Sequence, residues 1–205
     1  MPTFTNADIM RISGSGSAYA ALLLHRMVNK GEAMRIERGK YYLKGTDIYA
    51  IASNVVHPSY ISLMSAFRYH GITTQILLSA DVVSVRRHKA IEGVSEHKIN
   101  FMTLHRDRFF GFYRDRDTGA FVAYVEKAIL DALYFQNPPM AYVKEAMLNA
   151  HEERKLDTAR LSRFTRLMGS ATLERRVREA IAQTGIMRWS NILTNDVDTD
   201  ERVRN

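Results

Sequence analysis

HRMVNKGEAMRIERGKYYLKG, residues 25–45, is the stretch that decides how the beginning of this chain folds. Its first residues continue a helical pattern that ends at Gly31, because glycine readily adopts the left-handed conformation found after helices. Two β-like runs follow, AMRI and KYYL, and the residues ERG between them supply the glycine of a tight turn. The sequence therefore predicts a helix followed directly by a two-stranded hairpin rich in Lys and Arg.

Another short helix is predicted before this one. NADIMRIS (residues 6–13) fits a helix capped by Asn6, and SGSGS ends it because glycine and serine disfavour helix interiors. Ser17 then caps the second helix, which turns Tyr19, Leu23 and Met27 to one side. The order helix, turn, helix and hairpin is that of a minimal winged helix-turn-helix, which we place at residues 1–45.

The net charge of +7 is concentrated in this small region. Residues 1–45 carry seven basic and three acidic side chains, whereas residues 46–205 carry 22 basic and 19 acidic ones. A strongly basic beginning favours a polyanionic partner, with nucleic acid as the first candidate. The alternative is a basic surface that only keeps the protein soluble.

Composition excludes several classes of site. The chain has no cysteine, so it has no disulfide, thiol nucleophile or cysteine-based zinc site. No apolar run approaches the roughly 18 residues that a membrane helix needs, and MPTFTNADIM does not resemble a secretion signal. We therefore expect a soluble, cytoplasmic protein that does not bind a membrane.

Residues 46–205 are predicted to form a mixed α+β domain. The helical patterns TDIYAIASNVV and SYISLMSAFRYHG come first, and five strand-like runs follow them. These runs are TTQILLS, VVSVRR, HKINFMTL, RFFGFY and AFVAYV. Four helices are predicted from Glu126 onward, before a polar tail, TNDVDTDERVRN, that is expected to fray. The expected fold is α+β, with a roughly five-stranded, mainly antiparallel sheet and C-terminal helices.

Three spaced segments resemble the AbiEi family. They are RIERGKYYL (35–43), similar to the family's wing, HPSYISLMSAFRYHGITTQ (57–75), and VEKAILDALY (125–134). Two departures accompany them, because only MPTFT precedes the predicted helix pair and Val125 stands where a proline commonly begins the family's helix. No segment after about residue 140 resembles the family.

The resemblance implies an antitoxin of an abortive-infection toxin–antitoxin system. Such proteins combine a winged helix that represses their own operon with a C-terminal domain that opposes a nucleotidyltransferase-like toxin. It therefore implies operator DNA and such a toxin as partners. A generic winged-helix transcriptional regulator and a protein-docking module remain alternatives.

The candidate DNA-binding residues follow from the predicted helix-turn-helix, whose second helix would contact base edges with its N-terminal half. That half lacks Arg, Asn and Gln, the usual bidentate partners of bases. We therefore expect limited sequence recognition near its start, and affinity that depends mainly on phosphate contacts and on salt. The candidates are Ser15, Ser17, Tyr19, His25, Arg26, Lys30, Arg35, Arg38 and Lys40.

Two groups of residues resemble catalytic sites. Ser59, Ser62 and Ser65 precede His70, but the glycine elbow of a hydrolase nucleophile is missing, and His70 suits the end of a helix.

Glu126, Lys127 and Asp131 form the second group. A first-turn glutamate and an i, i+4 ion pair explain these residues as structural. We expect no enzymatic activity, metal or cofactor. A metal-dependent nucleic-acid-processing enzyme that uses carboxylates of residues 107–131 remains the alternative.

Residues 154–178 form a second basic region, with eight basic and two acidic side chains. In LDTARLSRFTRLM the apolar side chains share one helical face, with Arg163 and Arg166 beside it. Arg160 falls inside that face and is expected to need a carboxylate partner. The region is either a solvated basic face or a second docking surface for DNA or an acidic protein.

Overall fold

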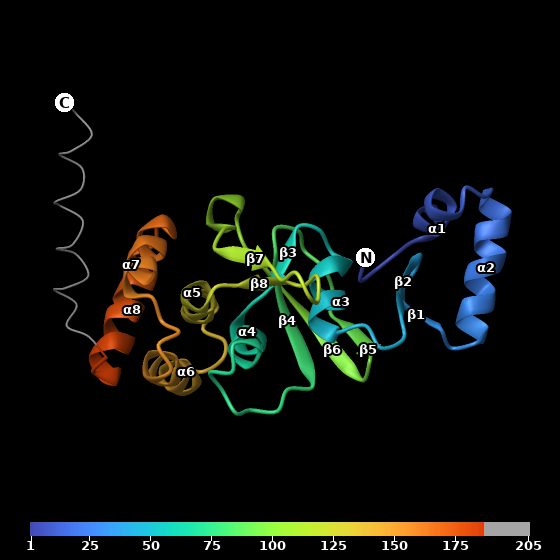
Figure 1. Ribbon diagram of the computed structural model, residues 1–205. Helices are drawn as coiled ribbons and strands as arrows, with labels where there is room; N and C mark the ends of the chain where they lie inside the picture. The colour runs from blue at the N-terminus through green and yellow to red at the C-terminus, as the bar shows by residue number, and fades with distance from the viewer. Residues whose placement is uncertain (187–205) are drawn as a thin grey trace. The chain divides into compact units, whose positions relative to one another are not determined.

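The computed structural model describes residues 1–186 (Figure 1). Within these residues the chain forms eight α-helices, a two-stranded sheet and a six-stranded sheet, so the expected α+β class is confirmed. The tail TNDVDTDERVRN lies outside the described residues.

The chain divides into two compact units. The first consists of Met1–Ile61, Leu77–His105 and Phe112–Val122; the second consists of Ser62–Ile76, Arg106–Gly111 and the chain from Ala123 onward. The division predicted between residues 45 and 46 stays a prediction.

The first unit begins with helix α1 (Asn6–Ser13) and helix α2 (Ser17–Asn29), which pack against each other. Thr5, and not Asn6, caps α1: its hydroxyl accepts a hydrogen bond from the backbone N–H of Asp8, whose carboxylate accepts one from the N–H of Thr5. This reciprocal arrangement satisfies two backbone donors, which Asn6 inside the first turn cannot do. Gly16 precedes α2 as its cap residue, so the prediction of Ser17 as the cap was wrong by one residue.

Strands β1 (Ala33–Glu37) and β2 (Lys40–Leu43) form the predicted hairpin beside α2 (Figure 1). Gly39 has a φ of 79° in the turn, a conformation that favours glycine. On the other side of β2, Phe4 and Tyr41 exchange two backbone hydrogen bonds of 2.9 Å. Residues 1–5 thus contribute an extended segment to the hairpin where the AbiEi-like pattern leads one to expect a helix.

The large sheet has the strand order β5-β6-β4-β3-β8-β7. The bounds are β3 (Ser59–Ile61), β4 (Ser79–Ser84), β5 (Ile91–Val94), β6 (His97–Thr103), β7 (Phe112–Arg114) and β8 (Phe121–Ala123), and a short 3₁₀ helix, η1 (Arg106–Arg108), precedes β7. Strands β3 and β4, and β5 and β6, pair antiparallel, whereas β4 and β6, and β3 and β8, pair parallel. The sheet is therefore mixed and six-stranded, which corrects the expectation of about five mainly antiparallel strands.

Three segments account for the difference between the expected and the observed sheet. Most of TTQILLS precedes β4 and is not a strand, whereas Ser59–Ile61, predicted as helical, forms β3. All three residues of β3 are buried, so the segment lacks the alternation that distinguishes a half-buried strand from a helix. Strand β5 was not predicted.

Helix α3 (Ile48–Val55) packs on β3 and β4 within the first unit. The side chain of Asp47 caps it by accepting a 2.9 Å hydrogen bond from the N–H of Ala50. Ile51 of α3, Tyr60 of β3 and Val82 of β4 are completely buried in this core. The hydroxyl of Tyr42 in β2 accepts a 3.2 Å hydrogen bond from the N–H of Ser95, so the hairpin is linked to the turn between β5 and β6.

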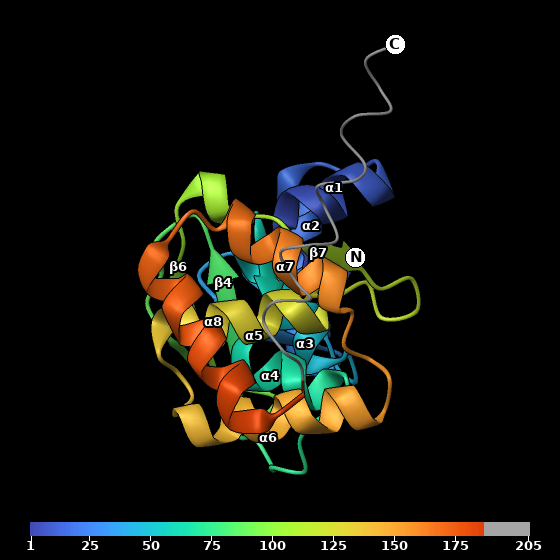
Figure 2. The ribbon, with the colours of Figure 1, turned by 90° about the vertical axis from the view of Figure 1, so that its left-hand side faces the viewer.

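The second unit is helical, and Figure 2 views it from the side of α7 and α8. Its helices are α4 (Leu63–Tyr69), α5 (Val125–Phe135), α6 (Met140–Glu152), α7 (Thr158–Leu167) and α8 (Ala171–Thr184). Helix α5 contacts each of the other four and is buried from Val125 to Leu133. The four helices predicted from Glu126 onward are therefore confirmed. No helix among the described residues is long and apolar enough to cross a membrane.

Candidate nucleic-acid interface

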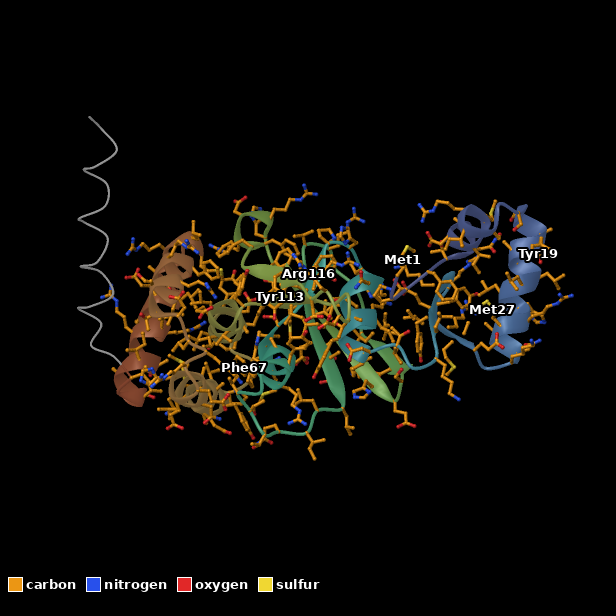
Figure 3. All side chains as sticks on the ribbon, in the orientation of Figure 1. Met1, Tyr19, Met27, Phe67, Tyr113 and Arg116 are labelled. Carbon is orange, nitrogen blue, oxygen red and sulfur yellow. The ribbon has the colours of Figure 1, made fainter. Side chains whose placement is uncertain are left out.

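Helix α2 has one buried face and one exposed face. Ala20 and Leu24 are buried, whereas Tyr19 and Leu22 are 56% and 45% exposed. The helix turns by about 100° per residue, so the core contact made through Ala20 leaves the side chain of Tyr19 facing outward. Tyr19 and Met27 are labelled in Figure 3. The exposed face of α2 therefore combines apolar and hydroxyl groups near its start with His25 and Arg26 further along.

Ser15 and Ser17 lie at the junction of the two first helices. The hydroxyl of Ser15 is 2.6 Å from that of Ser13, so it is partly engaged within the turn. Ser17 is exposed in the first turn of α2. Of the two serines, Ser17 is the one whose hydroxyl is free of a side-chain partner among the described residues.

An open groove of about 390 Å³ lies between α2 and the hairpin, and His25 and Arg35 both line it, together with Gly39 and Tyr41. Arg35 donates a 3.2 Å hydrogen bond to the carbonyl of Glu37, which holds its guanidinium along the hairpin. The side-chain amide of Asn29 lies 3.0 Å from Nε2 of His25. The fold thus brings together two candidate residues that are separated by the end of α2 and by Gly31.

Three of the candidate cations have neither an acidic partner nor a side-chain hydrogen bond within the described chain, whereas Arg35 has only its bond to the carbonyl of Glu37. Arg26 lies on α2, Lys30 directly after it and Arg38 in the hairpin turn, and all three are exposed. A phosphate can therefore approach these groups without displacing a carboxylate. These three side chains are therefore good candidates for contacts with the phosphate backbone of DNA, and such contacts are the main source of affinity for DNA.

Lys40 differs from these three because its ammonium group is already engaged. Its Nζ lies 2.8 Å from a carboxylate oxygen of Glu37 and donates a 2.6 Å hydrogen bond to the carbonyl of Val55, at the end of α3. The side chain therefore fastens the hairpin to α3. A role of Lys40 in DNA binding stays a prediction.

The serines and the histidine of the segment 57–75 have separate structural partners. Ser59 donates to the carbonyl of Ser53 at 3.0 Å, and Ser62 donates to the carboxylate of Asp131 at 2.8 Å. Nε2 of His70 lies 2.7 Å from the carbonyl oxygen of Ala123. Burial lowers the pKa of His70, and the nearby charge of Lys155 lowers it further, against the opposing effect of the hydrogen bond to Ala123.

Glu126, Lys127 and Asp131 are completely buried, but they belong to two different networks. Lys127 forms an ion pair with Asp131, and its ammonium lies 5.2 Å from the ring centre of Phe110. The carboxylates of Glu126 and Asp131 are therefore not arranged as one pair facing solvent.

The carboxylate of Glu126 accepts hydrogen bonds from helix α7 and from the residue that caps this helix. The N–H of Asp157 donates at 2.6 Å and Nη1 of Arg160 donates at 3.4 Å, so the carboxylate partner expected for Arg160 is confirmed. Burial raises the pKa of Glu126, although the N–H of Asp157 lowers it in part. Within residues 1–186, no cluster of three or more His, Asp or Glu side chains is arranged to hold a metal ion.

The first part of the chain is similar to one known family. Residues 1–44 match the model of a family of transcriptional regulators, the AbiEi antitoxins. The resemblance of RIERGKYYL to that family is thereby confirmed, because the segment lies inside the matched region. No curated protein matches the chain.

The region matched by the AbiEi model contains α1, α2 and the hairpin, and hence all nine candidate DNA-binding residues. The match supports a role as a transcriptional regulator and antitoxin.

The basic run Arg86–Lys89, outside the AbiEi match, was not among the predicted DNA-binding residues. The nearly balanced charge of residues 46–205 concealed it, although RRHK is visible as a local run.

Proposed function

We propose that this chain is a DNA-binding AbiEi-type antitoxin and transcriptional autorepressor. In this proposal α1, α2 and the hairpin form a winged helix that binds operator DNA in the cytoplasm. This proposal rests on three exposed cations, Arg26, Lys30 and Arg38, which have no acidic partner among residues 1–186. They lie on three adjoining parts of the segment that matches the AbiEi model.

The side chains of α2 and the hairpin suggest two separate roles, base contacts near the start of α2 and phosphate contacts further along. Its exposed start offers the hydroxyl of Ser17, the ring of Tyr19 and the side chain of Leu22, which suit apolar contact with thymine methyl groups and single hydrogen bonds in the major groove. The cations further along α2 and on the hairpin suit phosphate oxygens. Binding should therefore weaken steeply with salt and discriminate only moderately between sequences.

Operator binding is tested by titrating the protein against a labelled duplex from upstream of its own coding region. The variant Arg26→Gln/Arg38→Gln should bind at least about tenfold more weakly, and its plot of log affinity against log salt should be shallower by about 2, since each phosphate contact contributes about 0.9.

The matched control is Arg106→Gln/Arg116→Gln, which removes the same charge from two exposed arginines outside the AbiEi match. The control should bind as the wild type does. Equal binding by wild type, variant and control would refute the winged-helix interface.

The antitoxin part of the proposal concerns a second partner. We infer that the chain opposes a nucleotidyltransferase-like toxin encoded beside it, and that it represses the shared promoter. Co-expression with that neighbour should relieve growth arrest, and a promoter fusion should be repressed by the intact chain. Repression without relief of toxicity would instead identify a generic winged-helix regulator.

A further inference from the structure

The loop between β4 and β5 carries a second group of exposed cations. Arg86, Arg87 and Lys89 are exposed, and none has an acidic partner in the part of the chain that the structure describes. They lie more than 40 residues after the hairpin in the sequence, beyond the segment that matches the AbiEi model. Their charges are therefore as available to an anion as those of Arg26 and Arg38.

The loop is held against the hairpin by His88. Nε2 of His88 lies 3.3 Å from a carboxylate oxygen of Glu37, the last residue of β1, and Nδ1 lies 2.7 Å from the carbonyl oxygen of Lys89. The ring also packs 4.7 Å from the ring centre of Phe101 in β6. Because His88 contacts both Glu37 and Phe101, the loop that carries these cations lies beside the hairpin.

The hairpin and the loop enclose one open groove of about 600 Å³. Ile36 and Glu37 line it from the hairpin, and residues 87–92 line it from the loop and the start of β5. Its two carboxylates are already paired, since Glu37 contacts Lys40 and His88, and Glu92 lies 3.0 Å from Lys98. The unpaired charges of the groove are therefore positive.

We propose that Arg86, Arg87 and Lys89 form a phosphate-binding strip that continues the surface of the hairpin, so that bound DNA contacts both. This inference rests on the proposed function, because it assigns the strip to the same DNA molecule. Guanidinium groups suit this task, since their planar N–H donors can bind two phosphate oxygens together. The DNA site is accordingly longer than one that α2 and the hairpin alone would cover.

The test uses the full chain and the operator duplex, with hydroxyl-radical footprinting and a salt titration. The variant Arg86→Gln/Arg87→Gln/Lys89→Gln should lose protection at one end of the footprint and keep the protection that α2 and the hairpin give. Its affinity should fall at least about tenfold, and its salt slope should be shallower by about 2 to 3.

A matched variant, Arg68→Gln/Arg106→Gln/Arg116→Gln, removes three exposed charges elsewhere and should leave the footprint unchanged. Shortening the duplex at the affected end should weaken the wild type but not the loop variant, since the variant no longer uses that end.

The possible failures are distinguishable. A footprint and salt slope of the loop variant equal to those of the wild type, while Arg26→Gln/Arg38→Gln binds poorly, would overturn the strip and leave the proposed function intact. Failure of the wild-type protein to bind the operator at about 50 mM salt would overturn both.

Discussion

Lys127 and Asp131, one turn apart on α5, form an ion pair in which neither side chain is exposed. Burying two charges is costly, so the pair persists only where further contacts satisfy it. Here Ser62 donates to the second carboxylate oxygen, and the ring of Phe110 and the sulfur of Met168 approach the ammonium. The pair thus links α5 to three distant parts of the helical unit.

Replacing Lys127 by Met should destabilise the protein by about 3 to 5 kcal/mol, because Asp131 would keep a buried charge without its cation. Urea unfolding followed by circular dichroism measures the loss. The double variant Lys127→Met/Asp131→Leu should recover most of it, since both charges are then gone. A single variant that costs less than about 1 kcal/mol would contradict this account.

The buried carboxyl of Glu126 should make stability decline with rising pH. Because burial raises the pKa of Glu126 in the fold, the unfolded chain loses this proton first as the pH rises. The contribution is fully present below the ordinary pKa of glutamate and is lost as the pH rises through the folded value. Glu126→Gln keeps an acceptor for the N–H of Asp157, so its urea midpoint should depend less on pH between about 4 and 8. If the urea midpoint of Glu126→Gln changed with pH as that of the wild type does, this role of Glu126 would be refuted.

The contribution of His70 to stability should have the opposite dependence on pH. Its pKa is lowered in the fold, so its contribution is present above the ordinary histidine pKa and is lost as the pH falls through the folded value. His70→Gln, which retains a donor for the carbonyl of Ala123, should lose less stability than the wild type between about pH 7.5 and 5.5. His151→Gln, an exposed change on α6, is the control and should behave as the wild type does.

Gly111 should not tolerate a side chain. It has a φ of 74°, and an added Cβ would lie 2.8 Å from Cε2 of Phe164 and 3.1 Å from Cβ of Lys127. Gly111→Ala should therefore cost about 2 to 5 kcal/mol, from backbone strain and overpacking together. Gly169→Ala has a similar positive φ but open space around it, so it should cost only about 1 to 2 kcal/mol. Equal losses in urea unfolding would exclude the contact with Phe164 as the cause.

Tyr19 should contribute to sequence discrimination and not to the salt dependence of DNA binding. Tyr19→Ala should reduce affinity for the operator more than for an unrelated duplex of the same length, and leave the salt slope unchanged, because no charge is removed. Tyr142→Ala, an exposed tyrosine on α6, is the matched control. A uniform loss on both duplexes would place Tyr19 outside the base-contacting surface.

Local signals made the beginning of the chain predictable. Gly14, Gly31 and Gly39 all adopt positive φ, at the end of α1, after α2 and in the hairpin turn, so single residues fix where each element stops. Helices α7 and α8 likewise begin after Asp157 and Ser170, whose side chains cap them. Such signals act within a few residues and need no knowledge of the tertiary fold.

Long-range contacts account for what the sequence concealed. Strand β5 is defined by pairing with β6, as between Ile91 and Ile99, and not by a strong pattern of its own. Lys127 and Asp131 were correctly paired from their spacing, but their complete burial depends on Phe110 and Met168, which are distant in the sequence. The hydrogen bond from Lys40 to the carbonyl of Val55 likewise joins residues that are distant in the sequence.

The pairing of Phe4 with Tyr41 also determines what the hairpin offers to other molecules. The N–H and the carbonyl of Tyr41 point away from β1, and both are hydrogen-bonded to the backbone of Phe4. At this position, β2 therefore has no free backbone groups on its outer edge. Open strand edges invite pairing between chains and aggregation. Residues 1–5 therefore act as a protective cover, and a variant lacking them should self-associate through the newly exposed edge of β2.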